Sequence, residues 1–401
     1  MSPAAGPLGC QVFWVPRSVH RSWSWGFVAP RIVGGRRRVG GASVLGAGVG
    51  SPVLVVGIRG AQDPRGAIGT IAGVGEPVER RVAARVGLVG NPSDGYGGAV
   101  LAVPVAPLAA HVVVRPGDGV RFDGGGGALR SWSTPAEWRD EVRRTGHVGD
   151  DRLISAALAV VSDHVSSGGG TPAGVEIVWD TVVPRTVGLA GSSALAVAVV
   201  DAVAMSWGCR LDRRVLAALA LRAERDELGI AAGWQDRVVQ SFGRPVLVDA
   251  ARLDEVDGVA VPHVTTPEAP RTVSLVVGWR ATAGASSDDY HAPLRRQAAD
   301  LVAPMGELAG LARDAARAWV AGDVAAVAAA LDAGWRVRQA CAPLRADHAA
   351  LVESARAVGA SATTPGSGGS VVALPLDEAT RRAAIAALEA VGAEVLVFDV
   401  R

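Results

Sequence analysis

The feature that most constrains this 401-residue chain is a turn rich in glycine and serine that runs directly into a long apolar segment. The turn covers residues 183–194, VPRTVGLAGSSA, and an Ala- and Val-rich run follows it. A glycine turn that opens a helix presents backbone N–H groups and the positive end of the helix dipole, which together attract phosphate. The Walker A motif is excluded because the chain contains no lysine: all 40 of its Lys and Arg positions are arginine. We therefore expect phosphate to be held by backbone amides, hydroxyls, arginine and a metal.

Composition narrows the class of function. The length allows two domains with a sizeable core. The formal net charge of +1 gives no reason to expect nucleic acid or a membrane as a partner. Cys10, Cys209 and Cys341 are too far apart in sequence to form a metal motif or a disulfide framework, which predicts a cytoplasmic location. The longest apolar run, residues 194–205, is shorter than the ~18 residues of a membrane span and predicts a buried helix.

Residues 1–79 differ from the rest of the chain. They contain Trp14, Trp23 and Trp25 and an arginine run at 36–38, without a sustained helix or strand period. We expect either a disordered extension or a start codon assigned too far upstream, and we leave this segment out of the fold prediction. The organised part of the chain begins at Arg80.

Strands and helices are interspersed from Arg80 onward, which predicts an α/β or α+β fold. Strand patterns cover residues 81–89, 99–105, 111–115, 175–179, 245–248 and 272–277, and helical patterns cover 151–164, 194–207, 212–228 and most of 293–358. A final strand-turn-helix-strand set covers 361–400. Asp212 is a suitable N-cap for the helix that it precedes, and Gly229 is a suitable C′ residue after it.

Three glycine-containing turns, at residues 95–98, 188–193 and 366–369, lie far apart in the sequence. With 51 glycines in the chain, each one alone could be an ordinary turn between a strand and a helix. The first has four polar neighbours that would suit a ligand with many hydroxyls: Asn91, Ser93, Asp94 and Tyr96. The alternative for this set is a solvated Asx-type turn.

Two acidic stretches could complete a phosphate site. Glu224 and Glu227 share one face of the predicted helix, and a carboxylate there with a serine hydroxyl could bind Mg²⁺. The alternative is a solvated charged face. Asp236 follows a stretch of small residues, where a ligand can approach closely, and it forms a polar cluster with Gln235 and Arg237 in which a carboxylate beside an arginine stays ionised at neutral pH. The alternative for Asp236 is a helix N-cap.

In this order and at these separations, the motifs resemble the GHMP kinases, the superfamily of galactokinase, homoserine kinase, mevalonate kinase and phosphomevalonate kinase. The resemblance covers roughly residues 80–401. Three segments are similar to the glucuronokinase-like branch of sugar kinases: ARVGLVGNPSDGYGG at 84–98, GLAGSSA at 188–194 and LGIAAGWQDRVVQ at 228–240.

The resemblance implies a two-lobed GHMP kinase fold, with an S5-like N-terminal ATP-binding domain at 80–265 and a ferredoxin-like C-terminal domain at 266–401. It implies ATP and Mg²⁺ as cofactors and a small sugar as substrate, in a monomer or homodimer. The expected reaction phosphorylates a sugar hydroxyl, foremost the anomeric 1-OH of a sugar acid such as glucuronate. The alternatives are another sugar (a heptose, arabinose or galactose), a small alcohol, or a non-catalytic sensor of a sugar or nucleotide.

The resemblance also assigns roles to residues. Asp236 would orient the sugar hydroxyl and accept its proton, and Arg85 would stabilise the transferred phosphoryl group. ATP would be bound by Pro184, Gly188, Leu189, Ala190, Gly191, Ser192, Ser193 and Ala194, with Gly366, Gly368 and Gly369 beside it. Ser193, or alternatively Ser192, would ligate Mg²⁺ together with Glu224. The sugar would contact Asn91, Ser93, Asp94, Tyr96, Gln235 and Arg237.

Some positions depart from the family pattern. Thr363 and Thr364 stand where close relatives often carry a lysine and an aromatic residue, and Trp234 replaces a smaller aliphatic residue. A sugar carboxylate would call for a bidentate arginine. The candidates are Arg185, Arg237, Arg295, Arg296 and Arg338. Residues 286–291, which end in His291, look like a second loop on the substrate side.

Overall fold

The computed structural model describes residues 75–124, 126–280 and 300–401, which belong to one compact unit. Three predictions lie outside the described residues. They concern most of the segment 1–79, the loop at 286–291, and the candidate arginines Arg295 and Arg296.

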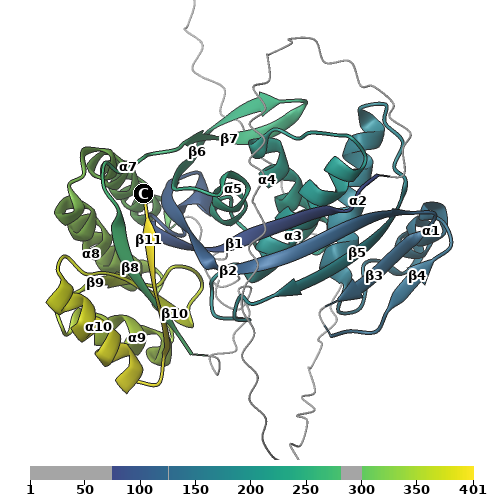
Figure 1. Cartoon of the computed structure of the whole chain (residues 1–401). Helices are drawn as coiled ribbons and strands as arrows, with labels where there is room; N and C mark the ends of the chain where they lie inside the picture. Colours follow the sequence, from purple (N-terminus) through teal and green to yellow (C-terminus); the bar gives the residue numbers. More distant parts are fainter. Residues whose placement is uncertain (1–74, 125, 281–299) are drawn as a thin grey trace, which may run out of the picture. The chain divides into compact units, whose positions relative to one another are not determined.

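The first sheet has seven strands. In chain order they are β1 (Val78–Val89), β2 (Ala99–Gly117), β3 (Val120–Gly124), β4 (Arg130–Trp132), β5 (Gly174–Thr181), β6 (Val246–Val256) and β7 (Val259–Thr265). Their spatial order is β4-β3-β5-β2-β6-β7, with β1 paired to β2 (Figure 1). All the pairs are antiparallel except β3 with β5. The long central strand β2 therefore connects the outer strands to β1, which carries Arg85.

Strand β2 is continuous, whereas the sequence pattern predicts two separate strands with a proline between them. A proline removes a donor from a strand ladder, which favours a break. The structure accommodates Pro107 at a bulge, because β1 pairs Ala83 with Ala109 but Ala84 with Val105. The residues between these partners are extra on β2, so the strand bends there without ending.

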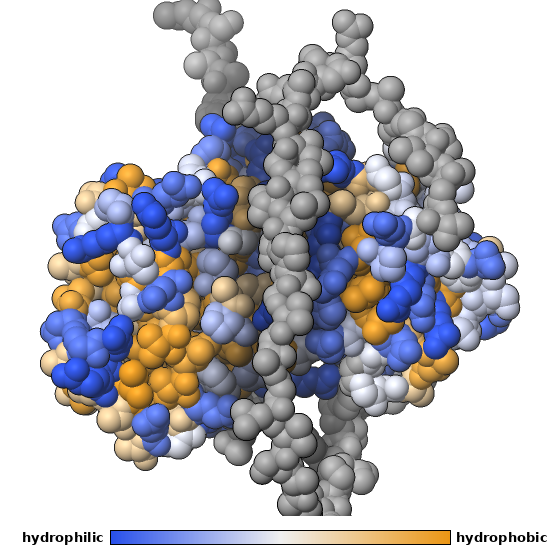
Figure 2. Space-filling model, viewed as in Figure 1, coloured by the Kyte–Doolittle hydropathy of each residue, from blue (hydrophilic) through white to orange (hydrophobic). Residues whose placement is uncertain are grey.

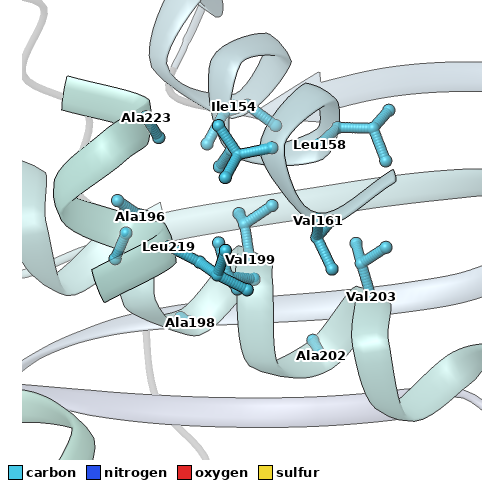
Figure 3. Close-up of a cluster of buried hydrophobic side chains, with 14 of the residues drawn as sticks. Ile154, Leu158, Val161, Ala196, Ala198, Val199, Ala202, Val203, Leu219 and Ala223 are labelled. Atoms are coloured by element: carbon cyan, nitrogen blue, oxygen red, sulfur yellow. The ribbon is translucent and has the colours of Figure 1, made fainter. Parts of the chain in front are cut away.

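Five helices accompany this sheet: α1 (Pro135–Thr145), α2 (Arg152–Ser167), α3 (Gly191–Ser206), α4 (Arg213–Arg222) and α5 (Gln235–Phe242). α3 packs on β1 and β2, and α2 and α4 pack on α3 (Figure 1). Ile154 and Leu158 of α2 lie against Val199 of α3, beside Leu219 of α4 (Figure 3). Because α3 is apolar on every side, it fits between a sheet and two helices, and the predicted buried helix is confirmed.

Glu224 lies just beyond the C-terminal end of α4. Asp212 is the N-cap of α4, as predicted, and its carboxylate accepts a hydrogen bond of 2.8 Å from the backbone N–H of Arg214. α4 does not continue as an α-helix to residue 228, because Ala223–Glu227 forms a π-helical turn. Such turns shift the phase of a helix and recur at functional sites. Gly229 follows it with a φ of 67°.

The second sheet is antiparallel and has four strands: β8 (Val273–Trp279), β9 (Ser361–Thr363), β10 (Ser370–Leu374) and β11 (Glu394–Val400). Their spatial order is β11-β8-β10-β9. Between β8 and β9 the chain forms α7 (Val302–Ala321), α8 (Val324–Cys341) and α9 (Ala346–Arg356), and α10 (Glu378–Ala390) lies between β10 and β11. This βαββαβ order is that of a ferredoxin-like fold, as expected.

One hydrophobic core joins the two sheets. Val86 of β1 belongs to the same buried cluster as Leu275 of β8 and Ala312 of α7. Val187 and Leu189 of the glycine-rich turn at 183–194 belong to it as well. The phosphate-binding candidate is therefore anchored by its apolar side chains where the two sheets meet.

The predicted mixed α/β class is confirmed. The pattern missed the short strands β3, β4 and β7 and the helices α1 and α5, and the domain boundary at residue 265 stays a prediction. In the part of the chain that the structure describes, no helix is long and apolar enough to cross a membrane. On the face seen in Figure 2, hydrophilic side chains are interspersed with apolar ones.

Gly90, at the end of β1, generates the first prediction. Its φ is 101°, and a Cβ there would lie 2.2 Å from the carbonyl oxygen of Ala99 and 2.8 Å from the Cβ of Ala312. Gly90→Ala should therefore lower the free energy of unfolding by roughly 2–4 kcal/mol in urea titrations, through strain and overlap. Gly95→Ala is the matched control, because nothing lies within 4 Å of a Cβ at Gly95. Equal stability of the two variants would contradict this account of the turn.

Candidate active site

The phosphate-binding candidate forms the N-terminal end of α3. Ala190 is the N-cap with a left-handed φ of 60°, and Ser192 and Ser193 lie in the first turn of the helix. The backbone N–H groups of this turn have no partner within the helix, so they can bind an anion. The side-chain amide of Gln240, on α5, donates a hydrogen bond of 2.9 Å to the carbonyl oxygen of Ala190. α5 therefore fixes the residue at which the turn enters the helix.

The third glycine turn lies directly on the second. A Cβ on Gly366 would lie 2.2 Å from the carbonyl oxygen of Gly188, and one on Gly188 would lie 2.8 Å from the carbonyl oxygen of Gly368. The hydroxyl of Ser370 donates a hydrogen bond of 2.6 Å to the carbonyl oxygen of Val187. Two backbones can approach this closely only where side chains are missing. Gly188 and Gly366 are therefore explained by the mutual contact of the two turns.

Glu224 lies in the π-helical turn and is only 1% exposed. Its Oε1 accepts hydrogen bonds from the hydroxyls of Ser192, at 3.1 Å, and Ser193, at 3.4 Å. Its Oε2 accepts hydrogen bonds from Nε of Arg237, at 2.6 Å, and from Nη2 of the same residue. Burial alone would lower the pKa of Arg237, but Glu224 and Asp236 outweigh it and the pKa is raised. The predicted pair of Ser193 and Glu224 is thus brought together at the helix end.

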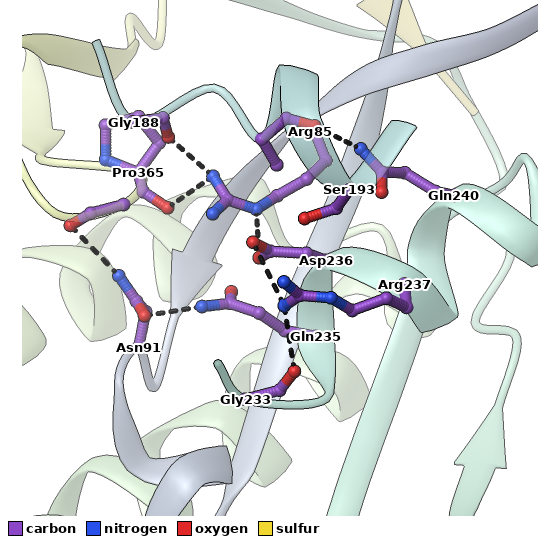
Figure 4. A network of polar contacts seen from close by, with 12 residues as sticks. Arg85, Asn91, Gly188, Ser193, Gly233, Gln235, Asp236, Arg237, Gln240 and Pro365 are labelled. Carbon is purple, nitrogen blue, oxygen red and sulfur yellow. Dashed lines mark hydrogen bonds and ion pairs between the residues drawn. The ribbon is translucent and has the colours of Figure 1, made fainter. Parts of the chain in front are cut away.

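Asp236 lies in the first turn of α5 and pairs with Arg85 of β1, whose Nε is 2.5 Å from Oδ1 (Figure 4). Nη1 of Arg85 donates hydrogen bonds to the carbonyl oxygens of Gly188, at 2.7 Å, and Pro365, at 3.1 Å. Arg85 is 4% exposed. One buried guanidinium therefore contacts the candidate base and both glycine turns.

Asn91, Gln235 and Asp94 form the next layer of polar groups. The amide of Gln235 donates a hydrogen bond of 2.5 Å to Oδ1 of Asn91, and the Asn91 amide lies 3.4 Å from the carbonyl oxygen of Gly366 (Figure 4). Oδ2 of Asp94 accepts a hydrogen bond of 2.9 Å from the backbone N–H of Gln235. Burial, helped by the nearby charge of Asp236, raises the pKa of Asp94 to about 6. A group of amides and one carboxylate thus lies next to Asp236.

Two residues of the predicted substrate set have other surroundings. Ser93 is fully buried, and its hydroxyl donates a hydrogen bond of 2.8 Å to the carbonyl oxygen of Ala99. This bond closes the turn. Tyr96 is half-buried and packs against a small apolar cluster that includes Leu301 and Met305. The prediction that Ser93 contacts the sugar therefore has no support from its geometry.

The candidate arginines differ in their surroundings. Arg185 is exposed and lies in the glycine-rich turn at 183–194. Arg237 is buried against Glu224, as described above. Arg338 of α8 is 2% exposed and donates hydrogen bonds to the carbonyl oxygens of Thr364, at 3.3 Å, and Gly366, at 2.5 Å. Arg338 is a substrate candidate from the sequence, but it lies behind the last glycine turn. Gln240 ends a segment that is similar to the family, and no signal in the sequence points to its contact with Ala190.

A family model described as the GHMP kinases N terminal domain matches residues 152–244, the range that holds Ser193, Glu224 and Asp236. Glucuronokinase 1 of Arabidopsis thaliana is 28% identical over 327 residues, which are 76% of this chain and 87% of that protein. Residues 152–244 therefore match a GHMP kinase N-terminal domain, and the chain is similar to a glucuronokinase over most of its length.

Solved GHMP kinases share its fold. Phosphomevalonate kinase of Streptococcus pneumoniae, in complex with phosphomevalonate and AMPPNP, has a TM-score of 0.66 at 14% identity, and the match covers 80% of this chain and 99% of that one. Galactokinase of Lactococcus lactis, complexed with galactose, has a TM-score of 0.64 at 17% identity over 81% of this chain and 93% of that one. These likenesses confirm the expected two-lobed GHMP kinase fold. The matched kinase domain and the similarity to kinases over most of the chain identify it as an ATP-dependent phosphotransferase that acts on an alcohol group.

The raised pKa of Asp94 predicts how the free energy of unfolding of this protein depends on pH. Because the pKa is about 6 in the folded chain and 3.8 ordinarily, the stabilisation from protonated Asp94 is full below pH 3.8 and is lost as the pH rises through about 6. Asp94→Asn keeps an oxygen for the N–H of Gln235 but cannot ionise. At pH 7.5 it should gain stability relative to the parent, by up to roughly 3 kcal/mol.

The measurement is urea unfolding of both proteins between pH 4.5 and pH 7.5. The stability difference between variant and parent should grow with pH and level off above pH 7. Asp249→Asn is the control, because the pKa of that carboxyl is lowered, chiefly by its hydrogen bond with Arg313. A difference between Asp94→Asn and the parent that stays constant over this range would refute the assignment.

Proposed function

We propose that this chain transfers the γ-phosphoryl group of ATP to the anomeric 1-OH of a sugar acid of the glucuronate type. One observation carries the proposal: Asp236, ion-paired with Arg85, lies between the phosphate-binding turn and the polar layer of Asn91, Gln235 and Asp94. A base so placed has a phosphate site on one side and hydroxyl-binding groups on the other. The similarity to Glucuronokinase 1 over most of the chain supports the choice of sugar.

The triphosphate is proposed to lie at the N-terminal end of α3. Residues 188–194 supply backbone N–H groups, and the helix dipole adds a positive potential. The turn at 366–369 lies against this loop and would border the nucleotide. No lysine is available, so the side-chain cation at the transferred phosphoryl group must be an arginine, and we assign this role to Arg85, which pairs with Asp236. We assign Nη2, its remaining guanidinium nitrogen, to the phosphoryl oxygens.

The residues at the helix end fit Mg²⁺. Two hydroxyls and Oε1 of Glu224 converge there, and Mg²⁺ prefers oxygen ligands, often one carboxylate together with phosphate oxygens. Among the described residues, no group of three or more His, Cys, Asp or Glu side chains could hold a metal, so one carboxylate plus substrate oxygens is the arrangement that fits. When bound, the ion would neutralise charge on the transferred phosphoryl group. Ser192, Ser193 and Glu224 would hold it.

The chemical step needs alignment and proton removal. The sugar hydroxyl oxygen forms a bond to the γ-phosphorus, and the bond between that phosphorus and the bridging oxygen breaks as ADP leaves. Asp236 accepts the hydroxyl proton. Its Oδ1 is held by Arg85, so the carboxylate is oriented before substrate arrives. Phosphoryl transfer gains most from such positioning and from fixed charges.

The nature of the sugar depends on where a carboxylate could bind. The guanidinium groups of Arg237 and Arg338 are bonded to protein oxygens. This leaves Arg185, Arg295 and Arg296 as candidates from the sequence. The polar layer beside Asp236 favours a second candidate function, a kinase for a neutral sugar. This layer contains amides and a carboxylate, which suit hydroxyl groups.

Release of ADP in the presence of ATP and Mg²⁺ tests both functions. The panel contains glucuronate, galacturonate, galactose, arabinose and a heptose. Turnover confined to a sugar acid supports the proposal, and turnover with a neutral sugar supports the second candidate. Binding of ATP without turnover on any sugar would refute both and would indicate a sensor.

Asp236→Asn should lower kcat by a factor of about 10² to 10⁴, because general-base help is lost while the shape and the acceptor for Arg85 are kept. The melting temperature should remain within a few degrees of the parent. Asp226→Asn is the matched control: this nearby carboxylate is about half exposed and pairs with Arg225, so its removal should leave kcat unchanged. Turnover of Asp236→Asn within ~10-fold of the parent would rule out Asp236 as the base.

A further inference from the structure

Arg237 is the arginine of the expected substrate set, and its guanidinium is turned toward the acidic groups of the site. Nε and Nη2 both donate to Oε2 of Glu224, and Nη1 donates a hydrogen bond of 3.0 Å to the carbonyl oxygen of Gly233. Nη1 is also 3.5 Å from Oδ2 of Asp236. All three nitrogens therefore have protein partners.

The two oxygens of Glu224 are used differently as a result. Oε2 is held by two nitrogens of one planar cation, and Oε1 is left facing the hydroxyls of Ser192 and Ser193 at the start of α3. Contacts at both oxygens, from the guanidinium on one side and from the two hydroxyls on the other, restrict the rotation of the carboxylate. Oε1 therefore has a fixed direction, toward the phosphate-binding turn.

Both charged side chains of this arrangement are buried. The Glu224 side chain is 1% exposed and that of Arg237 is 4% exposed. A buried charge needs a partner of opposite sign, and removal of one partner leaves the other uncompensated. No other basic side chain forms an ion pair with Glu224 in the described part of the chain. The orientation of Glu224 thus depends on Arg237.

We propose that Arg237 is a positioning residue that aims Oε1 of Glu224 at a divalent cation, and that it does not contact the sugar. This inference rests on the metal site of the proposed function. Arg237 follows Asp236 on α5, and its Nη1 lies near the second oxygen of that carboxylate. One side chain therefore holds the proposed metal ligand and borders the proposed base, which couples the geometry of the two acids.

Binding of Mn²⁺ in the presence of a non-hydrolysable ATP analogue tests the proposal without turnover. Free and bound Mn²⁺ are distinguished by electron paramagnetic resonance, and glucuronate binding is measured separately by calorimetry, or binding of whichever sugar the panel identifies. Arg237→Met should weaken Mn²⁺ binding at least tenfold and change sugar affinity less than twofold. Arg237→Lys should weaken it less, because an ammonium keeps the charge but cannot hold Oε2 from two nitrogens. Arg237→Lys also provides the test of Mn²⁺ binding if Arg237→Met does not fold.

Two further variants make the result specific. Arg225→Met is the matched control, since this exposed arginine of the same turn pairs with Asp226 and should bind Mn²⁺ as the parent does. In a Glu224→Gln background, Arg237→Met should have almost no additional effect on Mn²⁺ binding, because Arg237 acts through Glu224.

Four results would overturn the proposal. Loss of sugar affinity with unchanged Mn²⁺ binding would make Arg237 a substrate contact. An equal loss of both, with a lower melting temperature, would make its role purely structural. If Glu224→Gln weakens Mn²⁺ binding but Arg237→Met does not, Arg237 has no positioning role although the metal site stands. If neither weakens it, the metal site of the proposed function fails as well.

Discussion

The ion pair between Arg85 and Asp236 is the interaction on which the rest of the site depends. Arg85 comes from β1, which pairs with the central strand β2 of the larger sheet, and its guanidinium reaches α5, the glycine-rich turn at 183–194 and the turn before β10. These segments are far apart in sequence and have no other single group in common among the described contacts. Because the guanidinium is buried, its N–H groups need acceptors, and the carbonyls of Gly188 and Pro365 supply them. The charge that orients the proposed base therefore also fixes the turns around it.

The contact between the two glycine turns adds a second constraint. The backbones of Gly188 and Gly366 approach so closely that a side chain on either would overlap the other turn. Below this contact, Val187 and Leu189 are buried in the core that joins the two sheets. The loop is thus held by apolar side chains on one side and by backbone on the other. Its N–H groups can remain directed outward, since neither attachment uses them.

The sequence was sufficient for features that depend on local pattern. The glycine turns, the buried helix after them and the N-cap at Asp212 follow from residue type and spacing. It was insufficient where long-range packing overrode the pattern. Pro107 suggested a break that a bulge avoids, and α5 was missed because it is short and follows small residues. The site residues could be named but not their contacts. A π-helical turn decides that Glu224 faces inward, and nothing local indicates that Arg237 would hold it.

The four charged groups at the centre of the site, two carboxylates and two guanidiniums, are matched in number and paired in space. These two pairs cancel in charge, and Asp94 beside Asp236 adds negative charge above its pKa of about 6, so the side chains offer no net positive field to an approaching nucleotide. A triphosphate carries several negative charges, and the helix end offers only partial charges in return. In the proposed function, nucleotide and divalent cation would therefore be thermodynamically linked at this site, each strengthening the binding of the other by the same factor. An interior without net positive charge would favour the cation complex of the nucleotide over the bare anion.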